Sequence, residues 1–419
     1  MSNHNDSATS AAISFAATVW DERNPLANTR LRELVLSARV IGVGESAHFV
    51  AELNAARASL VAALVRDVGV CSVALEIGRD EAPLVEQWLS EERSEELRTL
   101  VGPLTVALYG TFLDDLRRRL PRGHGIRVLG IDLPNALSIA PSVAPLVDVL
   151  AAIDPAAAKL VEATSELASR VKGGSAAASA TSWLALERDV QDSLTVHLTR
   201  LRARVEALGT VHRTDDNAPL WREASALIEA AATTEVMLRA MADLFSGTGR
   251  VDDTTIREVF VARRISDAVQ TLPEGERIAY VAHNNHIQKT PVLFDGVLTA
   301  HPAGSLLAGM LGSAYRAIAL THTDERVPEM AFPAPTEVGF RVERTAAAAI
   351  DEHSFEAAGA AVLQSASAAI VLWDSADGAG VSRIRSQSAA TEVTARTFDA
   401  ALIFASAATD TAVTALGLE

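Results

Sequence analysis

Short apolar runs alternate with longer amphipathic segments along much of the chain. The β-branched character of four runs predicts buried parallel strands at residues 38–44, 71–75, 126–131 and 277–282. Segments whose apolar positions recur at helical spacing predict helices at residues 28–36, 52–66, 80–90 and 111–120. Strands that alternate with helices in this way are typical of an α/β fold with a mainly parallel sheet flanked by helices.

The pattern changes after residue 140. Long segments rich in Ala, Leu, Glu and Arg predict helices and carry little strand signal, at residues 156–171, 180–208, 218–245 and 254–271. We therefore predict a large all-helical insertion or cap over residues 141–272. It divides the α/β core into two parts, residues 18–140 and 273–419, and residues 1–17 form a flexible tail.

The second part of the core returns to short strands. Beyond residues 277–282 we predict a helix at residues 304–311 and strand-like runs at residues 315–320, 338–343, 369–373 and 398–404. No internal repeat is present.

Each of the first four predicted strands is followed by an acid or a histidine. These residues are Glu45 and His48, then Glu76, then Asp132, and finally His283 and His286. Ligands bind at the carboxyl ends of strands in open parallel α/β sheets. Four such strand ends would therefore bring three carboxylates and three histidines to one cleft, which predicts an active site.

Glu45 and His48 are three residues apart, so both can lie on one face of the segment that follows the strand. A carboxylate beside an imidazole fixes the tautomer and strengthens the ring as a base. Glu76 follows four apolar residues, and a partly buried carboxyl there would have the perturbed pKa that functional groups often show.

Other candidates contact the same predicted cleft. His283 and His286 can both face it if a helix or turn begins after their strand, and Asn284 between them is a candidate for substrate binding. Asp132 either caps the next turn or binds substrate. Arg57, nine residues beyond His48, either supplies an anion or oxyanion donor or is an exposed helix charge.

The remaining histidines lack such neighbours and are expected at the surface: His124, His197, His212, His301, His322 and His353.

The sequence disfavours two interpretations that involve a cofactor. Residues 42–47 fit a dinucleotide-binding fingerprint, but Glu45 would then face the pyrophosphate, and Glu76 follows at about 30 residues where about 20 is usual. Glutamates and histidines could also bind zinc, although the usual His-Glu-x-x-His spacing is absent. We therefore expect no cofactor and no metal. A serine nucleophile elbow of the Gly-x-Ser-x-Gly type and a P-loop are also absent from the sequence.

Bulk properties restrict the partners and the compartment. The net charge of −16 disfavours nucleic acid and anionic membranes as partners. The single cysteine, Cys71, fits a reducing compartment. We find neither a signal peptide nor an apolar stretch of about 18 residues that would span a membrane. The expected location is the cytoplasm, and the oligomeric state stays open.

Taken in order along the chain, these motifs resemble the erythromycin esterase family. The match rests on residues 44–48 with Glu52 and Arg57, on residues 73–76, and on residues 282–286. Weaker similarities are residues 130–132 and the predicted helix at residues 257–262. The family commonly has Thr before its first histidine and Gly after it, whereas this chain has Ala47 and Phe49.

The resemblance implies hydrolysis of a macrolide-like ester or lactone without a metal. It implies that His48 is the general base on water and Glu45 its orienting partner, while Glu76, His283 and His286 position water and stabilise the oxyanion. Three alternatives stay open. They are a biosynthetic tailoring enzyme that performs cyclisation, elimination or acyl transfer without water, a metal-dependent hydrolase, and a binding protein without catalytic activity.

Overall fold

The computed structural model describes residues 16–134, 137–372 and 381–419. Its main sheet has the strand order β1-β11-β14-β8-β2-β5-β3-β4. The strands of this sheet are β1 (Ala16–Val19), β2 (Val40–Val43), β3 (Val70–Leu75), β4 (Arg127–Gly130), β5 (Arg277–Val281), β8 (Tyr315–His322), β11 (Ala368–Leu372) and β14 (Ala400–Phe404).

The sheet is mainly parallel. All neighbours from β14 to β4 pair in parallel, and only β11 runs antiparallel to its neighbours β14 and β1. The predicted fold class is thereby confirmed. Strand β1 was not predicted, because residues 16 and 17 had been assigned to the tail. The rest of the predicted tail lies outside the described residues.

Helices are numbered in chain order. They are α1 (Thr29–Leu36), α2 (Ala51–Val68), α3 (Ala82–Leu89), α4 (Pro103–Arg119), α5 (Ala140–Val143), α6 (Leu146–Ile153), α7 (Ala158–Ala168), α8 (Ala176–Leu184), α9 (Arg188–His212), α10 (Ala218–Phe245), α11 (Thr255–Thr271), α12 (Asn284–Ile287), α13 (Ala303–Leu311), α14 (Phe355–Leu363) and α15 (Thr411–Ala415).

Alternate residues of the buried strands serve two different cores. Ile41, Val73 and Val281 pack in the cluster that includes helices α1 to α4. Ala74 and Tyr280 point the other way, into the cluster formed with α11, α13 and α14. Because successive side chains of a strand alternate between faces, both faces of this sheet are covered, as a parallel sheet requires.

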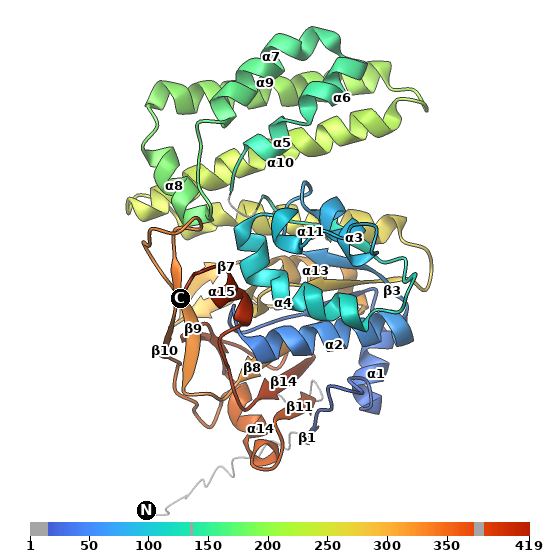
Figure 1. Cartoon of the computed structure of the whole chain (residues 1–419), viewed down its shortest axis with the longest axis vertical. Helices are drawn as coiled ribbons and strands as arrows, with labels where there is room; N and C mark the ends of the chain where they lie inside the picture. The colour runs from blue at the N-terminus through green and yellow to red at the C-terminus, as the bar shows by residue number, and fades with distance from the viewer. Residues whose placement is uncertain (1–15, 135–136, 373–380) are drawn as a thin grey trace, which may run out of the picture.

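The helical stretch between the two parts of the core divides between a cap and the sheet. Helices α5 to α10 stack beyond one end of the sheet, with α10 against α6, α8 and α9 (Figure 1). Helix α11 serves both regions, since Phe260 packs in the cap cluster while Val261 and Ile265 pack on the sheet. This double packing places the start of α11 at the junction of cap and core.

Three small hairpins lie outside the main sheet. They pair β6 (Val292–Phe294) with β7 (Val297–Ala300), β9 (Arg326–Ala331) with β10 (Arg341–Ala346), and β12 (Arg383–Ser386) with β13 (Ala389–Glu392). Of these strands, the sequence predicted only β10, and placed it at residues 338–343. The described residues include no helix that is both long and apolar enough to cross a membrane.

Candidate active site

The four strand ends that carry the predicted site residues are neighbours in space. Strands β2, β5, β3 and β4 lie side by side and run in the same direction, although β5 follows β4 by almost 150 residues of sequence. The segments after these strands therefore meet at one edge. Glu45, His48, Glu76, Asp132 and His286 come together there, as the sequence predicted.

The two glycines of the first motif make room for this meeting. A Cβ on Gly44 would overlap the side chain of Asn284, and one on Gly42 would press on Tyr315 and Ile287. Because neither glycine has a side chain, α12 can approach β2 closely. The dinucleotide fingerprint of residues 42–47 thus has a packing explanation.

His48 is held by one ring nitrogen. Its Nδ1 lies 2.8 Å from Oε1 of Glu45, and its Nε2 makes no hydrogen bond to any described residue. The backbone N–H of His48 donates to the side chain of Gln387 at 2.7 Å. His48 is 21% exposed, which is enough for contact with a ligand. A neutral His48 that donates from Nδ1 to Glu45 presents the lone pair of Nε2 to the cavity.

Glu45 is buried and is compensated by a cation. Nη2 of Arg57 lies 2.7 Å from Oε2 of Glu45, and the Arg57 side chain is fully buried. The guanidinium also donates to Asn54, which donates to Asp410, and it lies over the ring of Phe112 at 5.5 Å from the centroid. Arg57 was predicted to bind substrate, but its burial behind Glu45 keeps it out of the cavities. It fixes the charge of Glu45 instead.

Phe49, the residue after His48, has an unusual backbone. Its φ is +63°, in the left-handed region that glycine adopts without strain. The ring is fully buried and lies 5.9 Å from the ring of Phe340. The position where the family commonly has Gly is thus one where this chain holds a large side chain in a glycine conformation.

His283 has no ring nitrogen available for a ligand. Its Nδ1 accepts from the backbone N–H of Asn285 at 3.1 Å, so its Nε2 carries the proton and donates to the carbonyl of Ser46 at 3.0 Å. Burial, with nearby His48 adding, lowers the pKa of His283 well below its usual range. His283 is a neutral group that ties the β5 end to the β2 end.

Asn284 also connects strand ends. It is fully buried, its Nδ2 donates to the carbonyl of Leu320 at 2.9 Å, and its backbone N–H donates to the carbonyl of Glu45 at 2.8 Å. We predicted that it binds substrate. The structure instead places it between β2, β5 and β8, where its amide satisfies backbone groups.

His286 stands opposite His48 and is surrounded by carboxylates. Its Nδ1 lies 2.8 Å from Oε1 of Glu258, and its Nε2 lies 3.5 Å from Oε1 of Glu76. Burial alone would lower its pKa, but these two carboxylates outweigh burial and raise the pKa of His286 to about 9. The same attraction lowers the pKa of Glu258 despite its burial. His286 is therefore an imidazolium at neutral pH.

Arg257 supplies a second cation beside His286. It donates to both oxygens of Asp132, with Nε 2.9 Å from Oδ1, and its Nη2 lies 3.3 Å from Oε1 of Glu76. Its Nη1 is 3.4 Å from Nε2 of His286, so the two cations are kept together by the carboxylates around them. Asp132, predicted as a substrate contact, thus orients Arg257 and also borders the cavity.

Glu76 contacts both the segment that follows β5 and Arg257 of helix α11. Its Oε2 accepts the backbone N–H of His283 at 3.0 Å and faces the Tyr109 hydroxyl at 3.4 Å. Its Oε1 faces His286 and Arg257. One oxygen of the carboxylate is therefore held by hydrogen bonds, and the other is balanced by two cations.

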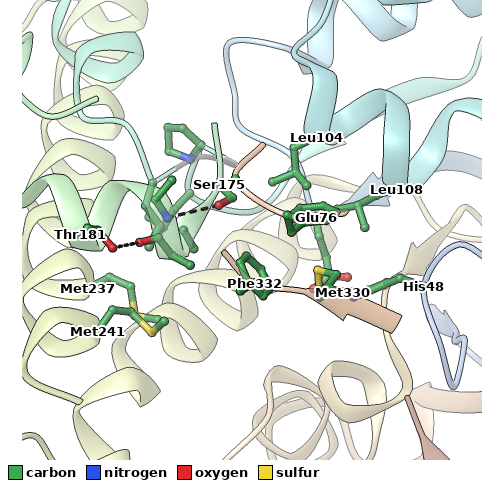
Figure 2. Close-up of a pocket in the computed structure, with 18 of the residues that line it drawn as sticks. His48, Glu76, Leu104, Leu108, Ser175, Thr181, Met237, Met241, Met330 and Phe332 are labelled. Carbon is green, nitrogen blue, oxygen red and sulfur yellow. Dashed lines mark hydrogen bonds between the residues drawn. The ribbon is translucent and has the colours of Figure 1, made fainter. Parts of the chain in front are cut away.

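A large cavity of about 900 Å³ opens above these groups. His48, Glu76, Arg257 and His286 form its polar floor. Figure 2 shows Met237 and Met241 of the cap on one side, Leu104 and Leu108 of α4 on the other, and Phe332 between them. A cavity of this size with apolar walls and a few convergent polar groups suits a large, mostly apolar small molecule.

A small cavity of about 420 Å³ adjoins the large one at His48. It shares His48, His286 and Met330 with the large cavity. Its further walls come from the three small hairpins and include the polar residues Thr299, Glu329, Ser386, Gln387 and Ser388.

Several site residues were missed by the sequence reasoning. Arg257 and Glu258 lie in the segment assigned to the cap, and only the weak family similarity of residues 257–262 pointed to them. Glu329 lies in β9 and Gln387 lies between β12 and β13, and the sequence predicted none of these three strands.

His322 was predicted at the surface, and this was wrong. Strand β8 extends two residues further than predicted, to His322, and buries the ring beside Arg385. Burial, with the charge of Arg385 adding, lowers its pKa to about 4.

Within the described part of the chain, no group of three or more His, Cys, Asp or Glu residues is arranged to hold a metal ion. Arginines occupy the positions beside the carboxylates, and each of the three site histidines has at least one nitrogen engaged within the protein.

A mainly parallel sheet that gathers histidines, carboxylates and arginines beneath a large cavity defines an α/β enzyme acting on a small molecule. Comparison with known proteins gives the particular family. The profile of the erythromycin esterase family matches residues 65–405. The chain belongs to this family and is a carboxylic ester hydrolase.

Two individual members of the family are similar in sequence to this chain over most of their length. The chain is 37% identical to erythromycin esterase type I of Escherichia coli over 91% of this chain and 94% of that protein. It is 26% identical to erythromycin esterase type II of Escherichia coli over 75% of this chain and 76% of that protein.

The fold matches solved structures as well. A mutant of erythromycin esterase EreC in its open conformation superposes with a TM-score of 0.86 at 36% identity, covering 91% of this chain and 94% of that one. A succinoglycan biosynthesis protein superposes with a TM-score of 0.68 at 17% identity, covering 93% and 94%, which shows a shared fold alone.

Proposed function

We propose that the protein hydrolyses the ester of a macrocyclic lactone of the macrolide class, with His48 as the general base and without a metal. The observation that carries the proposal is the placement of His48. One ring nitrogen is fixed by Glu45, and the other opens into a large apolar cavity that also contains the cations His286 and Arg257. The names of the two relatives from Escherichia coli support erythromycin as the first substrate to test.

Two groups of residues in the polar floor perform different parts of the reaction: His48 acts on water, and His286 with Arg257 acts on the carbonyl oxygen. Nε2 of His48 takes a proton from a water molecule, whose oxygen attacks the ester carbonyl. His286 and Arg257 stabilise the negative charge that develops on the carbonyl oxygen, because a preorganised donor in such a place contributes about 10²–10³-fold in rate. The ester C–O bond then breaks, and protonated His48 returns its proton to the leaving alkoxide. The products are an alcohol and a carboxylic acid, which releases its proton to the solvent and becomes a carboxylate.

Other residues act through these groups. Glu45 keeps His48 in the tautomer with a free Nε2, and Arg57 holds Glu45 in place through a buried ion pair. Glu76 and Glu258 hold the proton on His286. His283 and Asn284 position the strand ends, and we assign them no contact with the substrate.

The arrangement also supports chemistry without a metal. Two arginines and one imidazolium occupy the space around the carboxylates, so a divalent ion would meet repulsion at close range. These groups already supply the positive charge that a Lewis acid would provide.

The test is turnover of erythromycin followed by mass spectrometry, with wild type and His48→Ala, each with and without EDTA. The proposal requires a product heavier by one water, loss of turnover in His48→Ala, and no effect of EDTA. Loss of activity with EDTA would contradict the metal-free mechanism. Consumption of the substrate without gain of water would contradict hydrolysis and support a cyclisation or elimination.

A further inference from the structure

The small cavity contains a carboxylate whose charge is not compensated by the protein. Glu329 lies in its wall, and no lysine, arginine or histidine among the described residues forms an ion pair with it. The other site carboxylates all have cations, namely Glu45 with Arg57, Glu76 and Asp132 with Arg257, and Glu258 with His286. Glu329 differs from all of them.

Glu329 is nevertheless held firmly. Its Oε1 accepts from Nε2 of Gln387 at 3.1 Å and from the backbone N–H of Met330 at 3.0 Å, and its Oε2 accepts from the backbone N–H of Ser388 at 3.1 Å. All three donors are neutral. The carboxylate is therefore preorganised, half-buried and negatively charged, which is the state in which it attracts a cation from a ligand.

The hairpin itself does not explain the charge. Glu329 lies directly opposite Glu343 in the register of β9 and β10, and like charges at such positions destabilise a pair of strands. Glu343 is exposed and pairs with Arg341 instead. An acid at position 329 therefore has a use other than strand pairing.

A second group in the same wall lacks a partner. Asn285 borders the small cavity, and its Nδ2 donates to Ser386 at 2.9 Å, but its buried Oδ1 accepts no hydrogen bond from the described residues. An unsatisfied buried acceptor is costly, so a ligand hydroxyl there would gain a hydrogen bond at little expense. The cavity thus offers the uncompensated charge of Glu329 and a free acceptor, and the cation in its wall, His286, is balanced by Glu76 and Glu258.

The small cavity is close enough to the chemistry to bind part of the same molecule. Both cavities include His48 and His286, and the Gln387 side chain extends from Glu329 to the backbone N–H of His48. A substituent on a substrate whose ester lies at His48 can therefore reach Glu329 while the apolar part fills the large cavity.

We propose that the small cavity is a substrate subsite for a hydroxylated substituent that carries a protonated amine, with Glu329 as the partner of the ammonium group and Asn285 as a hydroxyl acceptor. This inference rests on the proposed ester hydrolysis and specifies its substrates. The enzyme selects esters with a basic amino substituent, such as an amino sugar, over neutral ones.

The test compares two probes, erythromycin, which carries a dimethylamino group, and its N-oxide, which has almost the same size but no net positive charge. The variants are Glu329→Gln and, as the matched control from the partner strand, Glu343→Gln. In wild type and Glu343→Gln we expect KM to be about tenfold or more lower for erythromycin than for the N-oxide. Glu329→Gln should raise KM for erythromycin alone and bring the two values together.

A different set of results overturns the inference. Equal KM values for both probes in wild type would do so, as would a Glu329→Gln variant that loses kcat equally with both. The second result would mean that Glu329 acts only by holding Gln387 and thereby His48. Should Glu329→Gln fail to fold, the wild-type comparison of the two probes still decides.

Failure of the proposed ester hydrolysis can be distinguished from failure of the proposed subsite. In that case wild type hydrolyses neither probe, and calorimetric binding of the two probes to wild type replaces KM. Tighter binding of erythromycin than of its N-oxide would support the subsite even without turnover, and equal binding would overturn it.

Discussion

His48 and His286 both follow a central strand and both contact a glutamate at 2.8 Å, yet the structure places them in opposite electrostatic settings. The carboxylate partner of His48 is already neutralised by Arg57. His286 has two carboxylates, and their combined charge raises its pKa to about 9. In the proposed mechanism, one strand end therefore supplies the base and the other a cation. Whether a histidine paired with a carboxylate acts as a base or as a cation therefore depends on the further charges that surround the pair.

The comparison is tested most severely by removing the base. His48→Asn keeps an amide nitrogen that can donate to Glu45 but cannot take a proton from water. We expect kcat on erythromycin to fall by about 10²–10⁴-fold, which is the range for a general base, with the fold intact. Steady-state kinetics with circular dichroism measures both, and His212→Asn on the exposed end of α9 is the control.

Activity within a few-fold of wild type in His48→Asn would mean that another group activates water. In that event the open Nε2 of His48 would have no catalytic meaning, and His286 would become the candidate base.

The next largest effect concerns the charge behind Glu45. Arg57→Met removes a fully buried cation and leaves Glu45 buried without a partner, so we expect the free energy of unfolding to fall by about 3–5 kcal/mol. Arg66→Met, an exposed position on the same helix α2, should change it by less than about 0.5 kcal/mol. Urea denaturation compares the two. An equal, small effect of both would show that Glu45 does not depend on Arg57.

The raised pKa of His286 should make the free energy of unfolding depend on pH. The pKa of His286 rises from 6.5 to about 9 on folding, so the bound proton stabilises the folded state fully below pH 6.5. This contribution, on the order of 3 kcal/mol as an upper bound, is lost as the pH rises through 9. His286→Gln should lack this loss. Urea denaturation of both proteins below pH 6.5 and above pH 9 measures it, and parallel pH profiles would contradict a raised pKa.

The smallest effect concerns strain beside His48. The φ of +63° at Phe49 lowers the free energy of unfolding by about 1–2 kcal/mol relative to a glycine in the same conformation. Phe49→Gly and Phe49→Ala both lose the buried ring, but only the alanine retains the strain. We expect both variants to be destabilised, with Phe49→Gly more stable than Phe49→Ala by about 1 kcal/mol. Thermal unfolding of the pair measures the difference, and a more stable alanine variant would show that the backbone there is not strained.

The sequence predicted the side of the site that depends on local pattern. Apolar runs that end in Glu45, Glu76, Asp132 and His283 identified the central strands, because a buried strand and the residue that follows it are adjacent in the chain. Parallel pairing then brought these ends together without further information. The same locality explains why α10 was predicted with its correct bounds, whereas the predicted helix at residues 180–208 combined the end of α8 with most of α9.

What the sequence did not show depends on contacts between distant segments. Arg257 reaches the site because α11 packs on the sheet as well as on the cap, and an amphipathic pattern does not reveal which neighbour a helix has. Strands β9, β12 and β13 of the small hairpins carry polar residues and lack the continuous apolar runs that identified the equally short central strands β2 and β4. Arg57 and Asn284 were correctly placed near the strand ends but point into protein, which no spacing rule distinguishes.

The dependence of kcat/KM on pH, measured with erythromycin for wild type and His286→Gln, tests the division between base and cation most directly. We predict that wild-type kcat/KM declines as the pH rises through about 9, where His286 loses its proton. The variant should be slower at neutral pH and show no such decline. A wild-type activity that is unchanged or still rising above pH 9 would contradict the claim that a protonated His286 stabilises the oxyanion opposite His48.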